Sequence, residues 1–158
     1  MTQRILRVST LLITVLCITC LAVRHGDAEP KAEVTITSPT NGSEVGKEIV
    51  VKGTAVLPPG QHLWVLAHRS DYGPFWWPQS EAKPHPVSRV FEARAVFGVA
   101  ADVGWDFQVC VITVDTQGHK QIEAAWKEAM RSGDWTHPME LPEPTSPPQI
   151  VKVKKVRP

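Results

Sequence analysis

Alternating apolar and polar positions predict a series of short strands from residue 33 onwards. Val34 and Ile36 alternate with threonines, and residues 90–97 place Phe91 and Phe97 on one face and charged side chains on the other. Successive side chains of a strand point to opposite faces, so this pattern indicates half-buried strands. Residues 63–67 are apolar at every position, which indicates a central strand covered on both sides. With Pro, Asn and Gly turns between the segments, the pattern predicts a mainly β fold, a sandwich of about seven strands.

The apolar spacing changes to a helical one before the last strand. The positions that share one helical face are Ile122, Ala125, Trp126, Ala129 and Met130. They predict a helix over about residues 119–131, seated on the sandwich by Trp126, with Gly133 at the position of a C-terminal cap.

A proline-rich stretch separates this helix from the final strand. Five of the 14 prolines fall between residues 138 and 148. Proline lacks a backbone donor, so residues 135–148 are expected to cross the sandwich as an irregular segment outside any central ladder. In residues 150–156, Lys152, Lys154 and Lys155 interleave with apolar positions, which favours a solvated edge strand.

Together these segments predict one domain over residues 33–156. Its core is expected to comprise Val34, Ile36, Ile49, Val51, Leu63, Val65, Phe91, Phe97, Phe107, Val109 and Val111. Trp105 is expected on the same strand face as Phe107 and Val109.

The first 28 residues have the organisation of an export signal. Arg4 and Arg7 precede the uncharged stretch 8–23, and small residues stand before a cut after Ala28. Sixteen residues of helix span about 24 Å, less than the ~30 Å hydrocarbon core, so cleavage is favoured over an uncleaved anchor. A lipoprotein signal would use Cys20, but the preceding Thr19 fits it poorly. The mature domain is expected to be periplasmic or secreted, with a polar leader at 29–32 and with membrane contact only if the signal remains attached.

Charge and cysteine content change once this segment is removed. The full chain has 158 residues and a formal net charge of +1. Removing residues 1–28 leaves 130 residues, a net charge of −1 and a single cysteine, Cys110. A charge near zero argues against nucleic acid as a partner. One cysteine excludes an internal disulfide framework.

Several motifs resemble exported bacterial modules of the immunoglobulin-like or fibronectin III-like β-sandwich class. These motifs are ITSPTNGSEV (36–45), VKGTA (51–55), LWVL (63–66), WWPQ (76–79) and FG (97–98). The first fits the I-x-x-P-x-x-G-x-x-V opening of such modules, and the resemblance covers roughly residues 33–115. It implies adhesion, spacing or binding and no catalytic residues, within an uncharacterised branch. The missing inter-sheet disulfide and the helix before the last strand depart from the simplest pattern.

The most unusual local feature is the aromatic group Tyr72, Phe75, Trp76 and Trp77. Residues 75–77 are expected to form a short strand closed by Pro78. Neighbouring tryptophans on a strand point to opposite faces, so one fills the core and the other meets a second surface. An outward ring beside Tyr72 would stack on a sugar or capture a peptide. Alternatively, the helix or the crossing segment covers it, with Trp126 or Trp135 as its neighbour.

Other candidate chemistry is weaker. His62, His68 and His85 flank one strand and loop, but they lack the spacing of a metal site, so no metal or other cofactor is predicted. Cys110 lies among β-branched residues and is interpreted as a small core side chain. The chain contains no G-x-S-x-G, P-loop or dinucleotide motif.

The sequence therefore predicts a non-catalytic binding module rather than an enzyme. Its expected partner is a protein or glycan of the cell envelope. The alternative with a defined ligand class is carbohydrate binding through the aromatic group.

Overall fold

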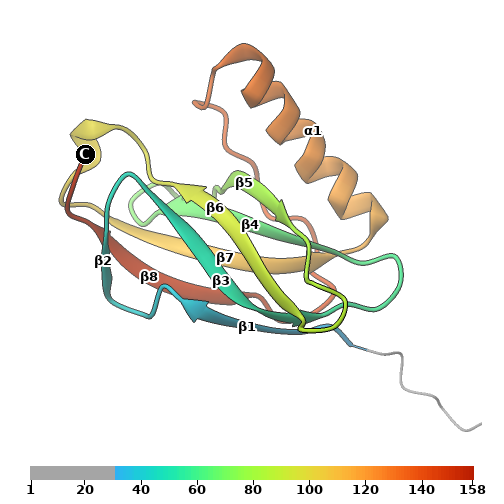
Figure 1. Cartoon of the computed structure of the whole chain (residues 1–158). Helices are drawn as coiled ribbons and strands as arrows, with labels where there is room; N and C mark the ends of the chain where they lie inside the picture. The colour runs from blue at the N-terminus through green and yellow to red at the C-terminus, as the bar shows by residue number, and fades with distance from the viewer. Residues whose placement is uncertain (1–30) are drawn as a thin grey trace, which may run out of the picture.

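The computed structural model describes residues 31–158, which form eight strands, the helix α1 and a short 3-10 helix, η1 (Figure 1). In chain order these are β1 (Glu33–Ser38), β2 (Ser43–Val45), β3 (Glu48–Val56), β4 (His62–Arg69), β5 (Trp77–Ala82), β6 (Val90–Val96), η1 (Ala100–Asp102), β7 (Asp106–Val114), α1 (Thr116–Ser132) and β8 (Gln149–Lys155). The export signal predicted over residues 1–28 lies outside the described residues, as do the first two residues of the leader. No helix in the described part of the chain has the length and apolarity needed to span a membrane.

The strands form two sheets, which confirms the prediction of a mainly β fold. One sheet has the order β1-β3-β6, and the other has the order β2-β8-β7-β4-β5. All neighbours are antiparallel except β2 and β8, which run parallel. Residues 63–67, which are apolar at every position, form most of β4. This strand lies between β5 and β7, as expected of a strand covered on both faces.

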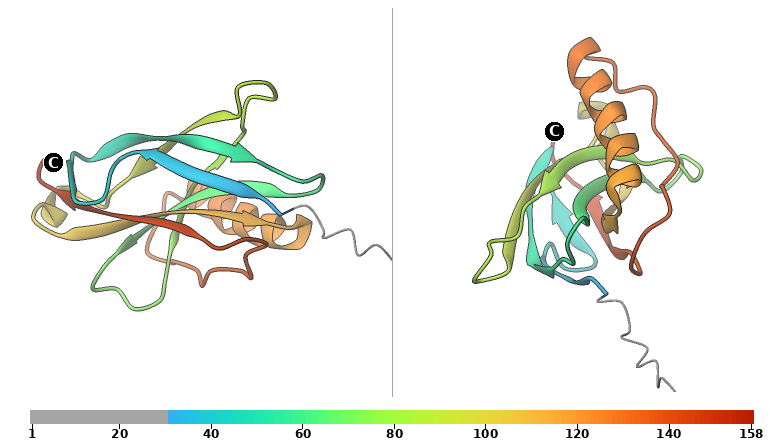
Figure 2. Two further views of the ribbon diagram at one scale, coloured as in Figure 1. Left: turned by 90° about the horizontal axis from the view of Figure 1, so that it is seen from below. Right: turned by 90° about the vertical axis from the view of Figure 1, so that its right-hand side faces the viewer.

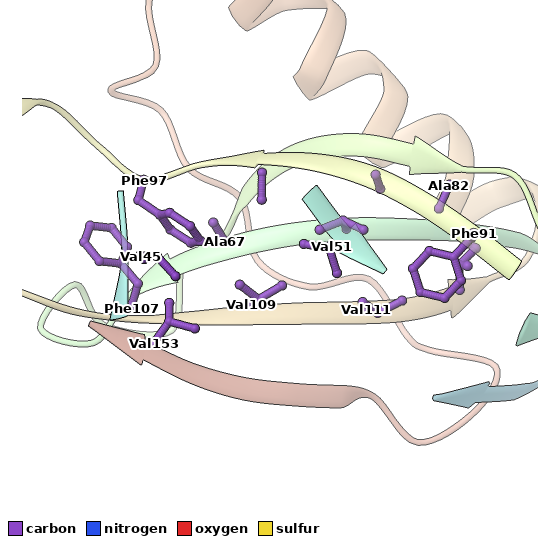
Figure 3. Packing of buried hydrophobic residues seen from close by; sticks show 14 of the residues in the cluster. Val45, Val51, Ala67, Ala82, Phe91, Phe97, Phe107, Val109, Val111 and Val153 are labelled. Carbon is purple, nitrogen blue, oxygen red and sulfur yellow. The ribbon is translucent and has the colours of Figure 1, made fainter. Parts of the chain in front are cut away.

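The main core lies between the two sheets (Figure 3). Phe97 and Phe107 meet edge to face at one end, with ring centroids 5.3 Å apart, and Phe91 fills the other end. Val51, Leu63, Val65, Val109 and Val111 are also buried there, whereas Val34, Ile36 and Ile49 are partly buried against this core. The alternation along β6 and β7 therefore indicated their inward faces.

A second core, on the outer face of the five-stranded sheet, holds α1 (Figure 2). Its buried members are Trp64, Leu66, Trp76, Cys110, Ile112, Val114 and Ile122. Trp126 of α1 packs edge to face on Trp64, with ring centroids 6.4 Å apart. This is why β4 is apolar on both faces: one face fills the sandwich and the other receives the helix.

The helix begins three residues before its predicted start, and its predicted C-terminal cap at Gly133 is confirmed. It begins at Thr116 because the Asp115 side chain accepts a 2.8 Å hydrogen bond from the Gly118 N–H and caps the first turn. It ends at Gly133, whose φ of 71° provides a left-handed cap. Met130, placed on the buried face by its spacing, is exposed because the sheet beneath does not extend to the last turn.

Three strand predictions were wrong. The aromatic segment 75–77 was expected as a strand closed by Pro78, but β5 begins at Trp77 and runs through Pro78 to Ala82. Residues 43–45 form an unexpected strand, β2. Because β2 pairs with Val153–Lys155, β8 is covered on both sides there and is not a free edge.

The chain returns from α1 to β8 over the outer face of the five-stranded sheet. Met139 forms an isolated bridge with Trp76, with hydrogen bonds of 2.8 and 2.9 Å between their backbone groups. Thr145 donates its backbone N–H to the Thr113 carbonyl at 2.8 Å. These contacts hold the crossing segment beside the second core.

Candidate functional site

Four exposed aromatic side chains and the partly buried Trp77 gather where β4 ends and β5 and β7 begin. With the arginine between them they form what we call the aromatic surface: Arg69, Tyr72, Phe75, Trp77, Trp105 and Trp135. Strand pairing brings these segments together, because Arg69 lies opposite Phe107 and Ala67 lies opposite Trp77. Trp135 joins them from the segment that follows α1.

Arg69 is at the centre of the aromatic surface. Its guanidinium carbon lies 5.5 Å from the Tyr72 ring centroid and 4.9 Å from that of Trp105. Two carboxylates fix the guanidinium, with Nε donating to Asp71 at 2.7 Å and Nη1 donating to Asp102 at 2.6 Å. The hydrogen bond with Asp71, followed by that with Asp102, raises the pKa of Arg69. The surface therefore presents a permanently charged, immobilised planar group beside two aromatic rings.

The loop beneath Arg69 is held by polar contacts. Asp102, in η1, accepts a 2.7 Å hydrogen bond from the Val99 N–H. The Lys155 ammonium donates to the carbonyls of Phe97 (2.8 Å) and Val99. Lys155 is buried, which corrects the prediction of a solvated lysine on an edge strand. Its ammonium donates to the Phe97 carbonyl and is a second donor to the Val99 carbonyl, which also accepts the Asp102 N–H at 3.0 Å.

Trp76 and Trp77 point to opposite sides, as their strand-like backbone requires. Trp76 is only 7% exposed and packs in the second core, with its ring 5.0 Å from that of His68. It is therefore no longer a candidate for ligand contact. Trp77 is partly buried, and its indole N–H donates to the Trp135 carbonyl at 2.8 Å. Its ring lies 5.1 Å from that of Tyr72, which is 43% exposed, and Phe75 is exposed beside this pair.

The structure adds Trp105 to the surface, contrary to the prediction that it faces the core. It is 45% exposed because β7 begins only at Asp106, so the strand alternation does not extend back to residue 105. Gly104, with a φ of 95°, turns the chain immediately before it. The signal available in the sequence was this glycine, which ends the strand pattern before Trp105.

The histidines named from the sequence do not form one site. The His68 ring bonds to the Phe75 carbonyl at 2.8 Å, and His85 accepts N–H groups in its own loop. Instead, a histidine cluster forms from His62 of β4, Glu81 of β5 and His119 of α1. His119 comes from a distant part of the chain, and only packing of the helix brings it to the sheet, so no local spacing could have indicated the cluster.

Cys110 is buried in the second core. Burial raises the pKa of its thiol to about 12. A thiol that stays protonated and covered is a poor nucleophile. The interpretation of Cys110 as a packing residue therefore agrees with its position.

Comparisons with known proteins do not assign a family. No protein-family model matches the chain, and no curated protein matches it in sequence. The exposed chemistry of the aromatic surface is what indicates a function.

Proposed function

We propose that this chain is an exported, non-catalytic binding module that binds carbohydrate of the cell envelope through its aromatic surface. The observation that carries this proposal is the immobilised Arg69 guanidinium between the exposed rings of Tyr72 and Trp105. Export is supported by the signal-like pattern of residues 1–28.

The scaffold proposed for this module is an immunoglobulin-like sandwich. The strand orders β1-β3-β6 and β2-β8-β7-β4-β5 support this proposal, because β4, β7 and β8 adjoin in one sheet while β1, β3 and β6 adjoin in the other, as Greek-key connections would require. Two features depart from the antibody-type domain: α1 lies between β7 and β8, and Cys110 is a free thiol within the described residues.

The aromatic surface suits a sugar for two reasons. A pyranose ring has an apolar face of C–H groups that packs on an aromatic ring, and exposed Tyr and Trp offer such rings together with a polar edge. Its hydroxyl groups need fixed donors and acceptors around that contact. Arg69 and Asp71 provide both kinds of group, because a bidentate pair leaves further carboxylate lone pairs and guanidinium N–H groups, and the two side chains are 25% and 35% exposed.

The geometry also limits the cost of binding. Arg69 is held by two carboxylates, and Trp77 is held by its bond to the Trp135 carbonyl. Side chains that are already ordered lose little rotamer entropy when a ligand arrives. A pre-organised aromatic surface of this kind is more typical of a binding site than of solvent-exposed packing residues.

The proposal is tested by co-sedimentation of the purified chain with insoluble polysaccharides: peptidoglycan, chitin and β-glucan. We expect retention on at least one of them, and we expect Tyr72→Ala and Trp105→Ala each to weaken it about five- to thirtyfold, equivalent to ~1–2 kcal/mol of lost stacking. Arg69→Lys keeps the charge but loses the planar fork, so it should also weaken retention.

Val87→Ala is the matched control because Val87 is highly exposed and lies outside the aromatic surface. It should be retained like the unchanged chain. Equal retention of Tyr72→Ala, Trp105→Ala and the unchanged chain would contradict the proposal. So would absence of retention on all three polysaccharides combined with capture of an envelope protein, which would instead support a protein partner.

A further inference from the structure

The histidine cluster is separate from the aromatic surface and joins three elements. The Nδ1 of His62, at the start of β4, lies 3.0 Å from Oε1 of Glu81 on β5. The Nδ1 of His119, in the first turns of α1, lies 3.8 Å from the same oxygen. One donor atom from each residue can be chosen so that all three lie within 4.8 Å of one another.

The donors are held in place but remain accessible. The register of β4 on β5 fixes the separation of His62 and Glu81, since Leu63 lies opposite Ala82. The second core holds α1, and with it His119, against the sheet. The three side chains are between 16% and 29% exposed, so an ion can enter from solvent and still be partly shielded from it.

We propose that His62, Glu81 and His119 bind a divalent transition-metal ion, with Zn²⁺ as the ion that fits best. Two imidazole nitrogens and one carboxylate oxygen are a frequent Zn²⁺ donor set. Mg²⁺ and Ca²⁺ prefer oxygen ligands throughout and are therefore disfavoured. Cu²⁺ belongs to the same class of ion and would compete for the two nitrogens, because affinity for such donors rises towards copper.

Binding requires a defined local rearrangement. The two imidazole rings are stacked, with centroids 3.8 Å apart and planes inclined by 13°. Nitrogen lone pairs lie in the ring plane, so two nearly parallel rings cannot both point at one ion. One ring must turn about its side-chain bonds before an ion is shared.

His119 also gives up a hydrogen bond when it binds an ion. Its Nδ1 accepts the Trp64 indole N–H at 3.1 Å. If Nδ1 binds the ion, that acceptor is lost. If the other ring nitrogen binds it, Nδ1 carries the proton and cannot accept. In either case the environment of the Trp64 indole changes, which provides an optical readout.

Glu123 is a further carboxylate near the histidine cluster, although it is paired with Lys127 at 2.8 Å and is not one of the three donors. It follows His119 by four residues on α1 and so lies on the same helical face. The hydrogen bond from Lys127, together with smaller contributions from His119 and His62, lowers the pKa of Glu123.

An ion held by β4, β5 and α1 would connect the helix to the sheet, and its binding free energy would stabilise the folded chain.

The test is a titration of the purified, tag-free full chain with ZnCl₂ in a calorimeter, followed by Co²⁺ as a spectroscopic probe. We expect one ion per chain, a change in tryptophan fluorescence, a higher Tm with Zn²⁺, and visible Co²⁺ bands of a low-coordinate nitrogen and oxygen site. His62→Ala, His119→Ala and Glu81→Gln should each raise the dissociation constant at least about tenfold and remove the Tm increase.

His137→Ala is the control because His137 is highly exposed and also lies beside a carboxylate, 3.2 Å from Asp134. It should bind Zn²⁺ like the unchanged chain. Circular dichroism of each variant establishes that it is folded, and His62→Asn with Glu81→Gln decides the question if His119→Ala does not fold. The proposal is overturned if the unchanged chain takes up no Zn²⁺ at about 1 mM, if these folded variants bind it unchanged, or if His137→Ala abolishes binding.

Discussion

Arg69 donates a 2.6 Å hydrogen bond to Asp102, and this pair connects the aromatic surface to the loop between β6 and β7. Asp102 is nearly buried and uses its second oxygen to accept the Val99 N–H. The same carboxylate therefore orients the charged centre of the surface and closes η1. Binding and loop stability are expected to change together when Asp102 is replaced.

Asp102→Ala should lower the free energy of unfolding by about 1–3 kcal/mol, because it leaves the Val99 N–H without its acceptor and removes one of the two carboxylates on Arg69. It should also weaken polysaccharide retention. Urea unfolding and co-sedimentation measure the two effects. Asp71→Ala, which removes only a more exposed partner of Arg69, should cost less than about 1 kcal/mol. Equal unfolding free energies for Asp102→Ala and the unchanged chain would exclude the coupling.

Lys155→Met should destabilise the chain by about 1–3 kcal/mol, even though it replaces a buried charge with an apolar side chain of similar length. The reason is that the carbonyl of the buried Phe97 loses its ammonium donor, and the Val99 carbonyl keeps only the Asp102 N–H. Lys154→Met, on the exposed face of the same strand, is the control and should be nearly neutral. If the two variants unfolded at the same urea concentration, the ammonium would not be what holds the loop.

How far the sequence predicts this fold depends on whether a residue's environment is set locally. The alternation in β6 and β7 indicated their inward faces because strand geometry alone decides them. The apolar residues on both faces of β4 indicated a strand covered on both sides. They did not indicate that α1 covers one of these sides. Asp115 and Gly133 set the two ends of the helix, because each residue caps one end.

The residues whose environment was predicted wrongly are those whose contacts come from parts of the chain distant in sequence. Lys155 is buried because β2 covers one side of β8 and the loop after β6 presents its carbonyls to the ammonium. The histidine cluster requires α1 to pack on β4 and β5, which no spacing within one segment encodes. The aromatic group was recognised from its composition, but Trp105 and Arg69 join it only through the pairing of β4 with β7.

Gly53→Ala should destabilise the chain by about 1–3 kcal/mol, the usual cost of overpacking. A Cβ at Gly53 would lie 2.2 Å from the Thr35 carbonyl oxygen and 2.6 Å from the Phe91 ring, so β1, β3 or the core must shift. Gly46→Ala is the matched control, since a Cβ there meets nothing within 4 Å. Thermal unfolding of the two variants should separate them clearly, and similar Tm values would show that the strands accommodate the methyl group.

The buried thiol of Cys110 predicts a loss of stability at alkaline pH. Its pKa is raised to about 12 in the folded chain from a reference value of 9.0, so between these values the unfolded chain releases a proton that the folded chain retains. Unfolding is therefore favoured as pH rises above 9, and this contribution to stability falls by about 1 kcal/mol between pH 8 and pH 10. Urea unfolding at both pH values measures it.

Cys110→Ala separates the thiol from the other groups that titrate in this range. The variant should be less stable at pH 8 because it leaves a small cavity, but it should lose about 1 kcal/mol less than the unchanged chain on going to pH 10. An identical pH dependence in both proteins would mean that Cys110 ionises as easily in the folded state as in the unfolded one. That result would place the thiol in contact with water and remove its role as a packing residue beneath α1.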